Sequence, residues 1–365
     1  MSETKINVRS PYYIKYSDTN LNYVELDISI YTGTKTVIPS SVYSLKKYET
    51  GTTNYVVFEI SELVRDYIET EFDGTYDNEP VWVYLNADLY QSNGTQIGSP
   101  QTQFLLAFDG YNLFNEGINY PSEQFVLLTD RTNTDSEITI YKPSDGSIRI
   151  PVNTDQLDID EDGAVYDTFL DGVLVNDDVD ISTSSSSSSK IKYINVGSTF
   201  NKVELFRYQS GQSVITKMFT ILIEDLNCTK HESVKVTFYN RWGALQDLYF
   251  VGKTTQSINT TGEEYKANVI DFSTLTYNVA KHQYNQYDKQ GKTSLQLSTG
   301  YVNEDYNAWI EELMLSEKVW ITLDGTLYPA KPKTSSQTFK TRLNDSLVAY
   351  TVDFDFAFDQ IQNIR

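Results

Sequence analysis

Short stretches of alternating apolar and polar residues recur along this chain. In one of them Val24, Leu26, Ile28 and Ile30 fall on one face, with Tyr, Glu, Asp and Ser between them. This period of two is typical of a half-buried β-strand. Similar stretches, bounded by Gly, Asn, Asp and Ser, occupy residues 53–60, 80–94, 101–110, 136–152 and 213–226. Repeated short strands of this kind predict a mainly β protein built from β-sandwiches.

Two stretches follow a helical period instead. Residues 61–69 begin with Ser61, which can serve as an N-cap, and then place Leu63, Val64, Tyr67 and Ile68 on one side. Residues 303–316 carry Glu and Asp near their start and an apolar stripe of Tyr306, Trp309, Ile310 and Leu313. The pattern therefore predicts one short helix early in the chain and one amphipathic helix late in it.

Turn-rich segments divide the chain into three predicted domains, in keeping with about 150 residues per domain. Gly110, Gly117 and Pro121 suggest a junction near residue 118, and the polar stretch around Cys228 suggests a second. We expect tandem β-sandwich domains of immunoglobulin or fibronectin-III type at residues 1–118 and 119–228. A C-terminal β-rich α+β domain with helix 303–316 would then follow at residues 229–365.

The middle domain contains a run of serines, residues 184–189. Serine side chains offer nothing apolar to bury, so this segment is predicted to be a solvated loop.

Net charge limits the range of partners. The chain carries a formal charge of −21, with no basic run or patch. A surface that gathers nucleic acid or anionic lipid needs clustered Lys and Arg, so neither is expected to bind.

The N-terminus has no signal-type apolar stretch, no apolar run approaches the roughly 20 residues that cross a bilayer, and Cys228 is a lone cysteine. We expect a soluble protein that folds in a reducing cytoplasm without membrane insertion.

One stretch has the character of a metal loop. Asp158, Asp160 and Asp162 alternate before Gly163, an arrangement that can wrap Ca²⁺. The loop departs from the EF-hand pattern, because Phe169 stands where a bidentate Glu is required. An acidic surface turn is therefore the favoured interpretation, no cofactor is expected, and a Ca²⁺ site at these three aspartates is the alternative.

Other chemical motifs are incomplete. Gly-Lys-Thr occurs at residues 252–254 and 291–293, but Asp247 and Gln286 stand where a P-loop needs its upstream glycine. His231 and His282 have no marked nucleophile partner. Asp353 and Asp355 share a strand face and could supply glycosidase carboxylates. The opposite face is unbroken and apolar, with Val352, Phe354, Phe356 and Phe358, which favours a half-buried strand with a wet acidic side instead.

The stretch "FYNRWGALQDLYFVGKT" at residues 238–254 predicts a strand, a turn and a second strand. Gly243 can adopt a positive φ in the turn, and Arg241 is expected to pair with Asp247 across it. The stretch would orient Trp242 and Tyr249 into a core or against a neighbouring subunit. Arg241, Trp242, Gly243, Tyr249 and, on the late helix, Trp309 are therefore the predicted structural or interface residues, and no catalytic residue is predicted.

As a whole, "KVTFYNRWGALQDLYFVGKT" resembles a segment of virion tail proteins of tailed bacteriophages of Bacteroidota, including crAss-like and related marine phages. The stretches "INVRSPYYIKYSD", "FEISELVRDYI", "LSTGYVNEDYNAWIEELMLSEKVWI" and "FKTRLNDSLVAYTVDFDFAFDQIQNIR" agree with this resemblance. The resemblance implies a non-enzymatic structural component of the virion, in a ring or hub of the tail or neck.

The expected partners follow from this resemblance. They are further copies of the chain in a homo-oligomeric ring, neighbouring tail or neck proteins, and DNA that passes through without sequence-specific binding. Assembly would take place in the cytoplasm of the host bacterium. Two alternatives remain open on the residues alone: a receptor- or glycan-binding tail appendage, and a tail-associated glycoside hydrolase that uses Asp353 and Asp355.

Overall fold

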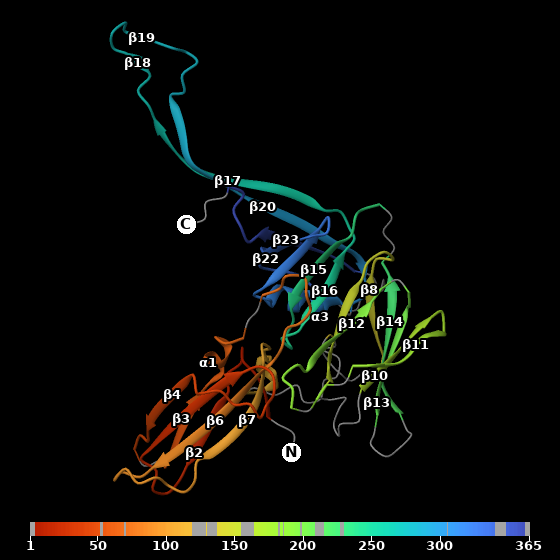
Figure 1. Cartoon of the computed structure of the whole chain (residues 1–365). Helices are drawn as coiled ribbons and strands as arrows, with labels where there is room; N and C mark the ends of the chain where they lie inside the picture. The colour runs from red at the N-terminus through yellow and green to blue at the C-terminus, as the bar shows by residue number, and fades with distance from the viewer. Residues whose placement is uncertain are drawn as a thin grey trace. The chain divides into compact units, whose positions relative to one another are not determined.

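The computed structural model describes residues 4–51, 54–68, 71–118, 129, 137–154, 164–181, 183, 184, 186–197, 199–208, 215–226, 230–304, 306–339 and 348–361 (Figure 1). This part of the chain is mainly β, with several sheets and little helix, so the predicted fold class is confirmed. None of its helices has the length and apolar character that crossing a membrane requires.

The chain packs into two compact units that do not follow a single cut in the sequence. Unit 1 contains residues 1–227, 237–249 and 308–316, and unit 2 contains residues 228–236, 250–307 and 317–365. Two later segments of the chain, residues 237–249 and 308–316, thus belong to unit 1. The division into three domains at residues 118 and 228 stays a prediction.

Unit 1 begins with a five-stranded sheet of order β1-β7-β6-β3-β4 and a two-stranded sheet β2-β5. Their strands are β1 (Thr4–Asn7), β2 (Tyr13–Ser17), β3 (Tyr23–Tyr31), β4 (Tyr43–Tyr48), β5 (Tyr55–Glu59), β6 (Val81–Tyr90) and β7 (Gln101–Phe108). β1 runs parallel to β7, and β3 runs antiparallel to β6 with Leu26 opposite Ala87. As predicted, Val24, Leu26, Ile28 and Ile30 are buried; they lie in one apolar core with residues of the β2-β5 sheet.

The first helix is shorter than the sequence suggests. A helix forms where it was predicted, but α1 spans Ser61–Arg65 rather than residues 61–69. Ser61 is not its N-cap: the cap position is Ile60, and the Ser61 amide donates to the Glu59 carboxylate. Val64 is fully buried, but Tyr67 is exposed beyond the helix end. One helical turn, ended at Asp66, is enough to bury Val64.

A second pair of sheets completes most of unit 1. The strands β11-β10-β13-β14-β8 form a five-stranded sheet, and β12-β9 form a two-stranded sheet. The strands are β8 (Glu137–Lys142), β9 (Ile148–Asn153), β10 (Ala164–Leu170), β11 (Val173–Asp180), β12 (Ile191–Val196), β13 (Lys202–Tyr208) and β14 (Ile215–Asp225). A short 3₁₀ helix, η1 (Phe114–Glu116), follows β7.

The serine run packs against the first sheet pair, so its prediction as a solvated loop is wrong for the described serines at its end. Ser188 is fully buried, and its Oγ accepts a hydrogen bond from the Gly33 amide at 2.7 Å. The Ser188 amide donates to the Gly33 carbonyl, and Ser187 forms a β-bridge with Thr34. Small side chains allow the two backbones to approach this closely. The run is therefore a contact between parts of unit 1 that are about 150 residues apart in sequence.

Late segments complete unit 1. β15 (Val234–Tyr239) ends in this unit and β16 (Leu245–Phe250) lies almost wholly within it. α3 (Tyr306–Leu315) is shorter than the predicted 303–316, and residues from 308 onward belong to unit 1. Its predicted stripe is confirmed, because the stripe residues Tyr306, Trp309, Ile310 and Leu313 are all buried.

Unit 2 contains the strand order β21-β22-β23-β20-β17 and a small pair β18-β19. The strands are β17 (Thr255–Lys266), β18 (Ile270–Asp271), β19 (Thr276–Tyr277), β20 (Tyr284–Val302), β21 (Val319–Leu323), β22 (Thr326–Pro332) and β23 (Val348–Phe356). In β23 the apolar residues Val352, Phe354 and Phe356 are buried, as predicted. Phe358, expected on the same face, lies beyond the strand end and is partly exposed.

A long hairpin extends from this sheet (Figure 1). β20 pairs with β23 from Ser294 onward, whereas its residues from Tyr284 to Thr293 pair with β17 alone. We call residues 258–293 the arm; it carries β18 and β19 at its far end. All twelve residues of β17 are exposed.

The contact of the serine run predicts a measurable effect on stability. Ser188→Ala removes the side-chain acceptor of the Gly33 amide, and we expect it to lower the free energy of unfolding by about 1 kcal/mol. Ser184→Ala, at an exposed position of the same run, is the matched control and should change it by less than about 0.5 kcal/mol. Urea unfolding of the two variants compares them, and equal effects would contradict the packing of Ser188.

Candidate functional site

The turn between β15 and β16 is built by one asparagine and one glycine. The Asn240 amide donates to the Ala244 carbonyl at 2.9 Å, and its side-chain Oδ1 accepts from the amides of Trp242 and Ala244 at 3.0 and 3.1 Å. Gly243 has φ +73°, and a Cβ there would lie 2.8 Å from the backbone of Asp109. The predicted positive φ of Gly243 is thus confirmed, and a close approach adds a second reason for glycine.

Arg241 is buried within unit 1 and bonded to a carboxylate. Its Nη2 lies 2.8 and 2.7 Å from the two carboxylate oxygens of Glu116, in η1. Its guanidinium carbon lies 4.2 Å from the ring centroid of Trp242, within cation–π range. The predicted ion pair with Asp247 is wrong: Arg241 turns to a residue 125 positions away in sequence instead.

A second ion pair lies on the other side of the turn. Arg9 holds Asp109 through two hydrogen bonds of 2.9 and 2.7 Å, and both side chains are less than one-tenth exposed. Beside it, the Tyr111 amide donates to the Arg241 carbonyl at 2.9 Å. A Cβ on Gly110 would lie 2.6 Å from that same carbonyl, so the two backbones are in direct contact.

Trp242 lies in a core, which decides between the two orientations that the sequence left open. It packs with Trp82, Leu106 and Phe108 of β6 and β7 and with Ile191 of β12. Trp82, Leu106 and Phe108 lie on the face of the first sheet that is opposite its main core, and Trp242 and Ile191 cover that face. Trp242 therefore joins the two sheet pairs of unit 1.

Asp247 is buried beside two hydroxyl groups. Tyr76 and Thr237 each donate to its Oδ1 at 2.6 Å, and the Arg149 amide donates to its Oδ2 at 3.1 Å. Burial, and next the charge of Asp247, raise the pKa of Tyr76 far above its usual value. Tyr76 therefore stays protonated at neutral pH and acts as a hydrogen-bond donor rather than as a base.

The remaining two predicted structural residues are also buried and bonded. The Tyr249 hydroxyl donates to the Ser147 carbonyl at 2.8 Å, and burial raises the pKa of Tyr249. The Trp309 indole donates to the Thr129 carbonyl at 2.8 Å. These contacts lie within unit 1.

Two adjoining pockets open beside this network, each of about 580 Å³. Asp77 and Glu79 line both, and Arg149 and Lys192 line one of them. The Lys192 ammonium donates to Ser189 Oγ at 3.2 Å. The polar lining, with both charge signs, suits water and small ions better than an apolar ligand.

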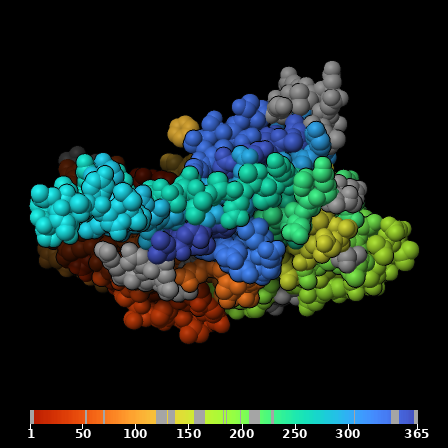
Figure 2. Space-filling view, turned by 90° about the horizontal axis from the view of Figure 1, so that it is seen from above, coloured from red at the N-terminus to blue at the C-terminus, as the bar shows by residue number. Residues whose placement is uncertain are grey.

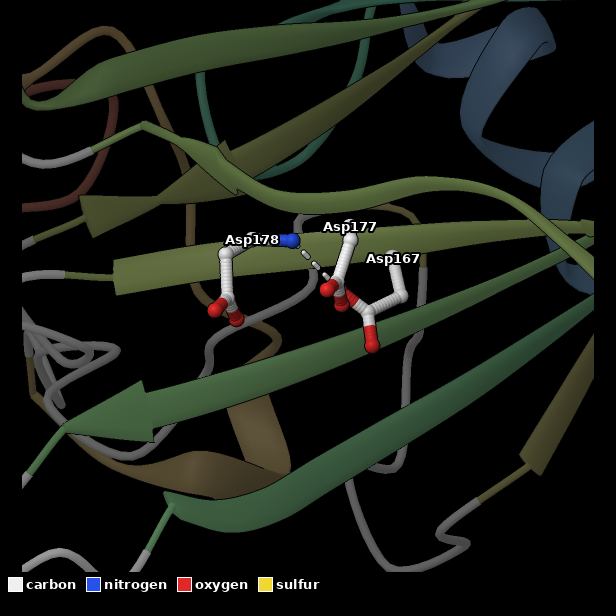
Figure 3. Close-up of side chains that lie close together, drawn as sticks. All are labelled: Asp167, Asp177 and Asp178. Carbon is white, nitrogen blue, oxygen red and sulfur yellow. Dashed lines mark hydrogen bonds between the residues drawn. The ribbon is translucent and has the colours of Figure 1, made fainter.

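A carboxylate cluster lies at the edge of the second sheet (Figure 3). Oxygens of Asp167, Asp177 and Asp178 lie within 4.8 Å of one another. The pairing of Tyr166 with Val179 and of Thr168 with Asn176 makes two residues of β11 oppose the single Asp167, as in a β-bulge. The Asp178 amide donates to Asp167 Oδ1 at 2.8 Å.

This cluster differs from the predicted metal loop. Asp158, Asp160 and Asp162 lie outside the described residues, so their role stays a prediction. Carboxylates are ligands that Ca²⁺ prefers, and the cluster could supply three of its six to eight oxygens. Two of the three aspartates are exposed, however, and exposed acidic groups are common without an ion. The sequence offered one signal that we missed, the adjacent pair Asp177-Asp178.

Asp353 and Asp355 both accept hydrogen bonds from neighbouring side chains of unit 2. Burial raises the pKa of Asp355, but hydrogen bonds from Ser294 and Lys333 outweigh it, so the pKa is lowered overall. Asp353 accepts a hydrogen bond from Gln296 at 2.8 Å. A glycosidase acid needs a raised pKa, which Asp355 lacks.

The other residues of the incomplete motifs give no catalytic grouping among the described residues. His231 and His282 are exposed, and Cys228 lies outside the described residues. Residues 291–293 of the second Gly-Lys-Thr lie within β20, where no loop surrounds a phosphate. That the protein is not an enzyme stays a prediction.

Comparisons with known proteins add little. No family model matches the chain, and the comparison with curated proteins gives no match. A crystal structure of trypsin-activated alpha-2-macroglobulin from Escherichia coli is similar at 9% identity, with a TM-score of 0.20. The match covers 82% of this chain but 22% of that one. At this TM-score the likeness carries no argument, so the functional proposal depends on the residues themselves.

Gly243→Ala tests the close approach of the turn to Asp109. The new Cβ would combine positive-φ strain with a clash against rigid backbone, so we expect a loss of about 2–4 kcal/mol in the free energy of unfolding. Gly98→Ala is the matched control, because Gly98 has φ +70° and open space around it. It should cost about 1 kcal/mol. Similar losses in both variants, measured by urea unfolding, would contradict the close approach.

Asp177→Asn tests the repulsion in the carboxylate cluster. Burial, and then the charges of Asp177 and Asp178, raise the pKa of Asp167. The hydrogen bond from the Asp178 amide lowers it, but by less, so the pKa is raised overall. A raised folded pKa means that stability is present at low pH and is lost as pH rises through that pKa. Removing one charge should therefore stabilise the protein by about 0.5 kcal/mol at pH 7 and by almost nothing below about pH 3.

Asp145→Asn makes the same charge change at an exposed position outside the cluster. Thermal unfolding across this pH range compares the two variants. An equal gain at pH 7 in both would show that the net charge, not the cluster, is responsible.

Proposed function

We propose that this chain is a non-enzymatic structural protein of a bacteriophage virion. Its copies form a homo-oligomeric ring or hub of the tail or neck, which joins neighbouring tail proteins and surrounds the DNA conduit. The resemblance of residues 235–254 and of both ends of the chain to phage tail proteins supports this proposal. The physical support comes from the structure of the arm.

The arm is the observation that carries the proposal. Its exposed large hydrophobic side chains are Ile258, Tyr265, Ile270, Phe272, Leu275, Tyr277, Val279, Tyr284 and Tyr287. A two-stranded hairpin is marginally stable in water by itself, and apolar surface of this extent on a soluble protein typically marks an interface. Figure 2 shows the arm, in cyan and teal, open at the surface. A partner that covers the arm would stabilise it.

The buried network of unit 1 supports a building block rather than a catalyst. Two ion pairs, Arg9 with Asp109 and Arg241 with Glu116, hold segments together that are far apart in the sequence. Tyr76, beside Asp247, is held in its neutral form. These interactions give a rigid body, and rigid bodies lose little conformational freedom when they assemble.

The acidic charge suits a conduit for DNA. At −21 the chain would repel a phosphate backbone wherever its carboxylates face the lumen, so DNA would pass without sticking. Acidic residues on the outer wall, with a neutral or basic lumen, would contradict this part of the proposal.

Imaging of the purified full-length chain and of the virion tests the proposal. We expect closed rings of more than three copies, with this chain around the axis of the tail or neck. A trimeric appendage at the tail periphery would instead support a receptor- or glycan-binding role. A chain that remains monomeric in solution and is missing from virion particles would contradict both interpretations.

A further inference from the structure

We propose that the arm of one copy docks on the β10–β11 edge of a second copy of this chain. The inference rests on the proposed function, since it assumes that the chain assembles with itself, and it names the two surfaces that meet. The contact is heterologous, with different surfaces on the two copies, as ring formation requires.

The arm has enough surface for a stable contact. Its nine exposed large side chains include Phe272 at 73%, Leu275 at 80% and Val279 at 90% exposure. Aromatic side chains bury about 150–250 Å² each, so the set presents on the order of 1,000 Å². A stable interface needs about 800 Å² from each partner. The arm alone therefore meets that requirement.

The arm also differs from the rest of the chain in charge. Residues 258–293 contain four acidic and four basic residues, whereas the whole chain carries −21. Toward its far end, residues 266–284 carry Lys266 and Lys281 against the single acid Asp271. Copies of a strongly acidic protein repel each other, and a neutral arm with a slightly basic end is the part that can approach another copy.

The β10–β11 edge offers the complementary surface. β11 is the outermost strand of its sheet, and Val173, Leu174 and Val175 are exposed on it. Residues 164–180 contain five aspartates and no Lys or Arg. The exposed apolar residues at the start of β11 can pack against the apolar side chains of the arm. The aspartates next to them can pair with the lysines of the arm.

The carboxylate cluster gives the edge its specificity. Charges and bulges on an edge strand prevent indiscriminate pairing with other strands, and β11 has both. The cluster of Asp167, Asp177 and Asp178 is also electrostatically strained by its like charges, which a lysine ammonium would relieve. The edge thus rejects most strands but accepts one with correctly placed lysines.

A charge-reversal cycle on the full-length chain tests this docking, with self-association measured by sedimentation velocity. Lys281→Glu and Asp177→Lys should each weaken association about tenfold, and the double variant should recover to within about threefold of the parent. Phe272→Ser with Val279→Ser should weaken association at least a hundredfold.

Val37→Ser removes an exposed apolar side chain outside both surfaces and is the control; it should leave association unchanged. All the altered positions are exposed, so circular dichroism should show the parent fold in every variant. If the arm variants weaken association but Asp177→Lys does not, the arm docks elsewhere, which overturns the inference and leaves the proposed function intact. If the arm variants have no effect, the inference is also overturned. A parent chain that never associates contradicts the inference and self-assembly together.

Discussion

The structure of unit 1 depends on the insertion of one tight turn between its two sheet pairs. Asn240 organises the turn, Gly243 lets it approach Asp109 without a side chain, and Trp242 fills the space between β6, β7 and β12. The Arg9–Asp109 pair is nearly dry, which makes each partner costly to leave alone, whereas Glu116 of the second pair remains partly exposed. Hydrophobic contact supplies the attraction here, while the paired charges fix a single arrangement of the segments.

The alternating pattern was sufficient to predict β3 and β23, because each buries one face and exposes the other. It was less informative for β6, where Val81, Trp82 and Val83 are all buried. Both faces of that strand are covered at this point, the second one by Trp242 and Ile191. Local periodicity cannot show this, since the covering residues come from more than 100 positions downstream in the chain.

The wrong predictions have the same origin. Arg241 was expected to bond within its own hairpin, and the serine run was expected to face water, because local sequence offered no other partner. The partners are Glu116 and the Gly33 backbone, brought near by the tertiary fold. The carboxylate cluster depends on a bulge in the β10–β11 register, which the sequence does not reveal. Of the candidate site, the turn and its glycine were predictable, whereas its contacts were not.

The distance in sequence between Arg241 and Glu116 has a consequence for synthesis. They are 125 residues apart, and a ribosome adding about 5–20 residues per second needs roughly 6–25 s to cover that length. During this time the outer face of β6 and β7 has emerged without the residues that will cover it. Trp82, Leu106 and Phe108 then lie on a nascent chain as an open apolar surface. A chaperone that binds such surfaces would meet this protein at that stage, before the turn at residues 240–244 has been synthesised.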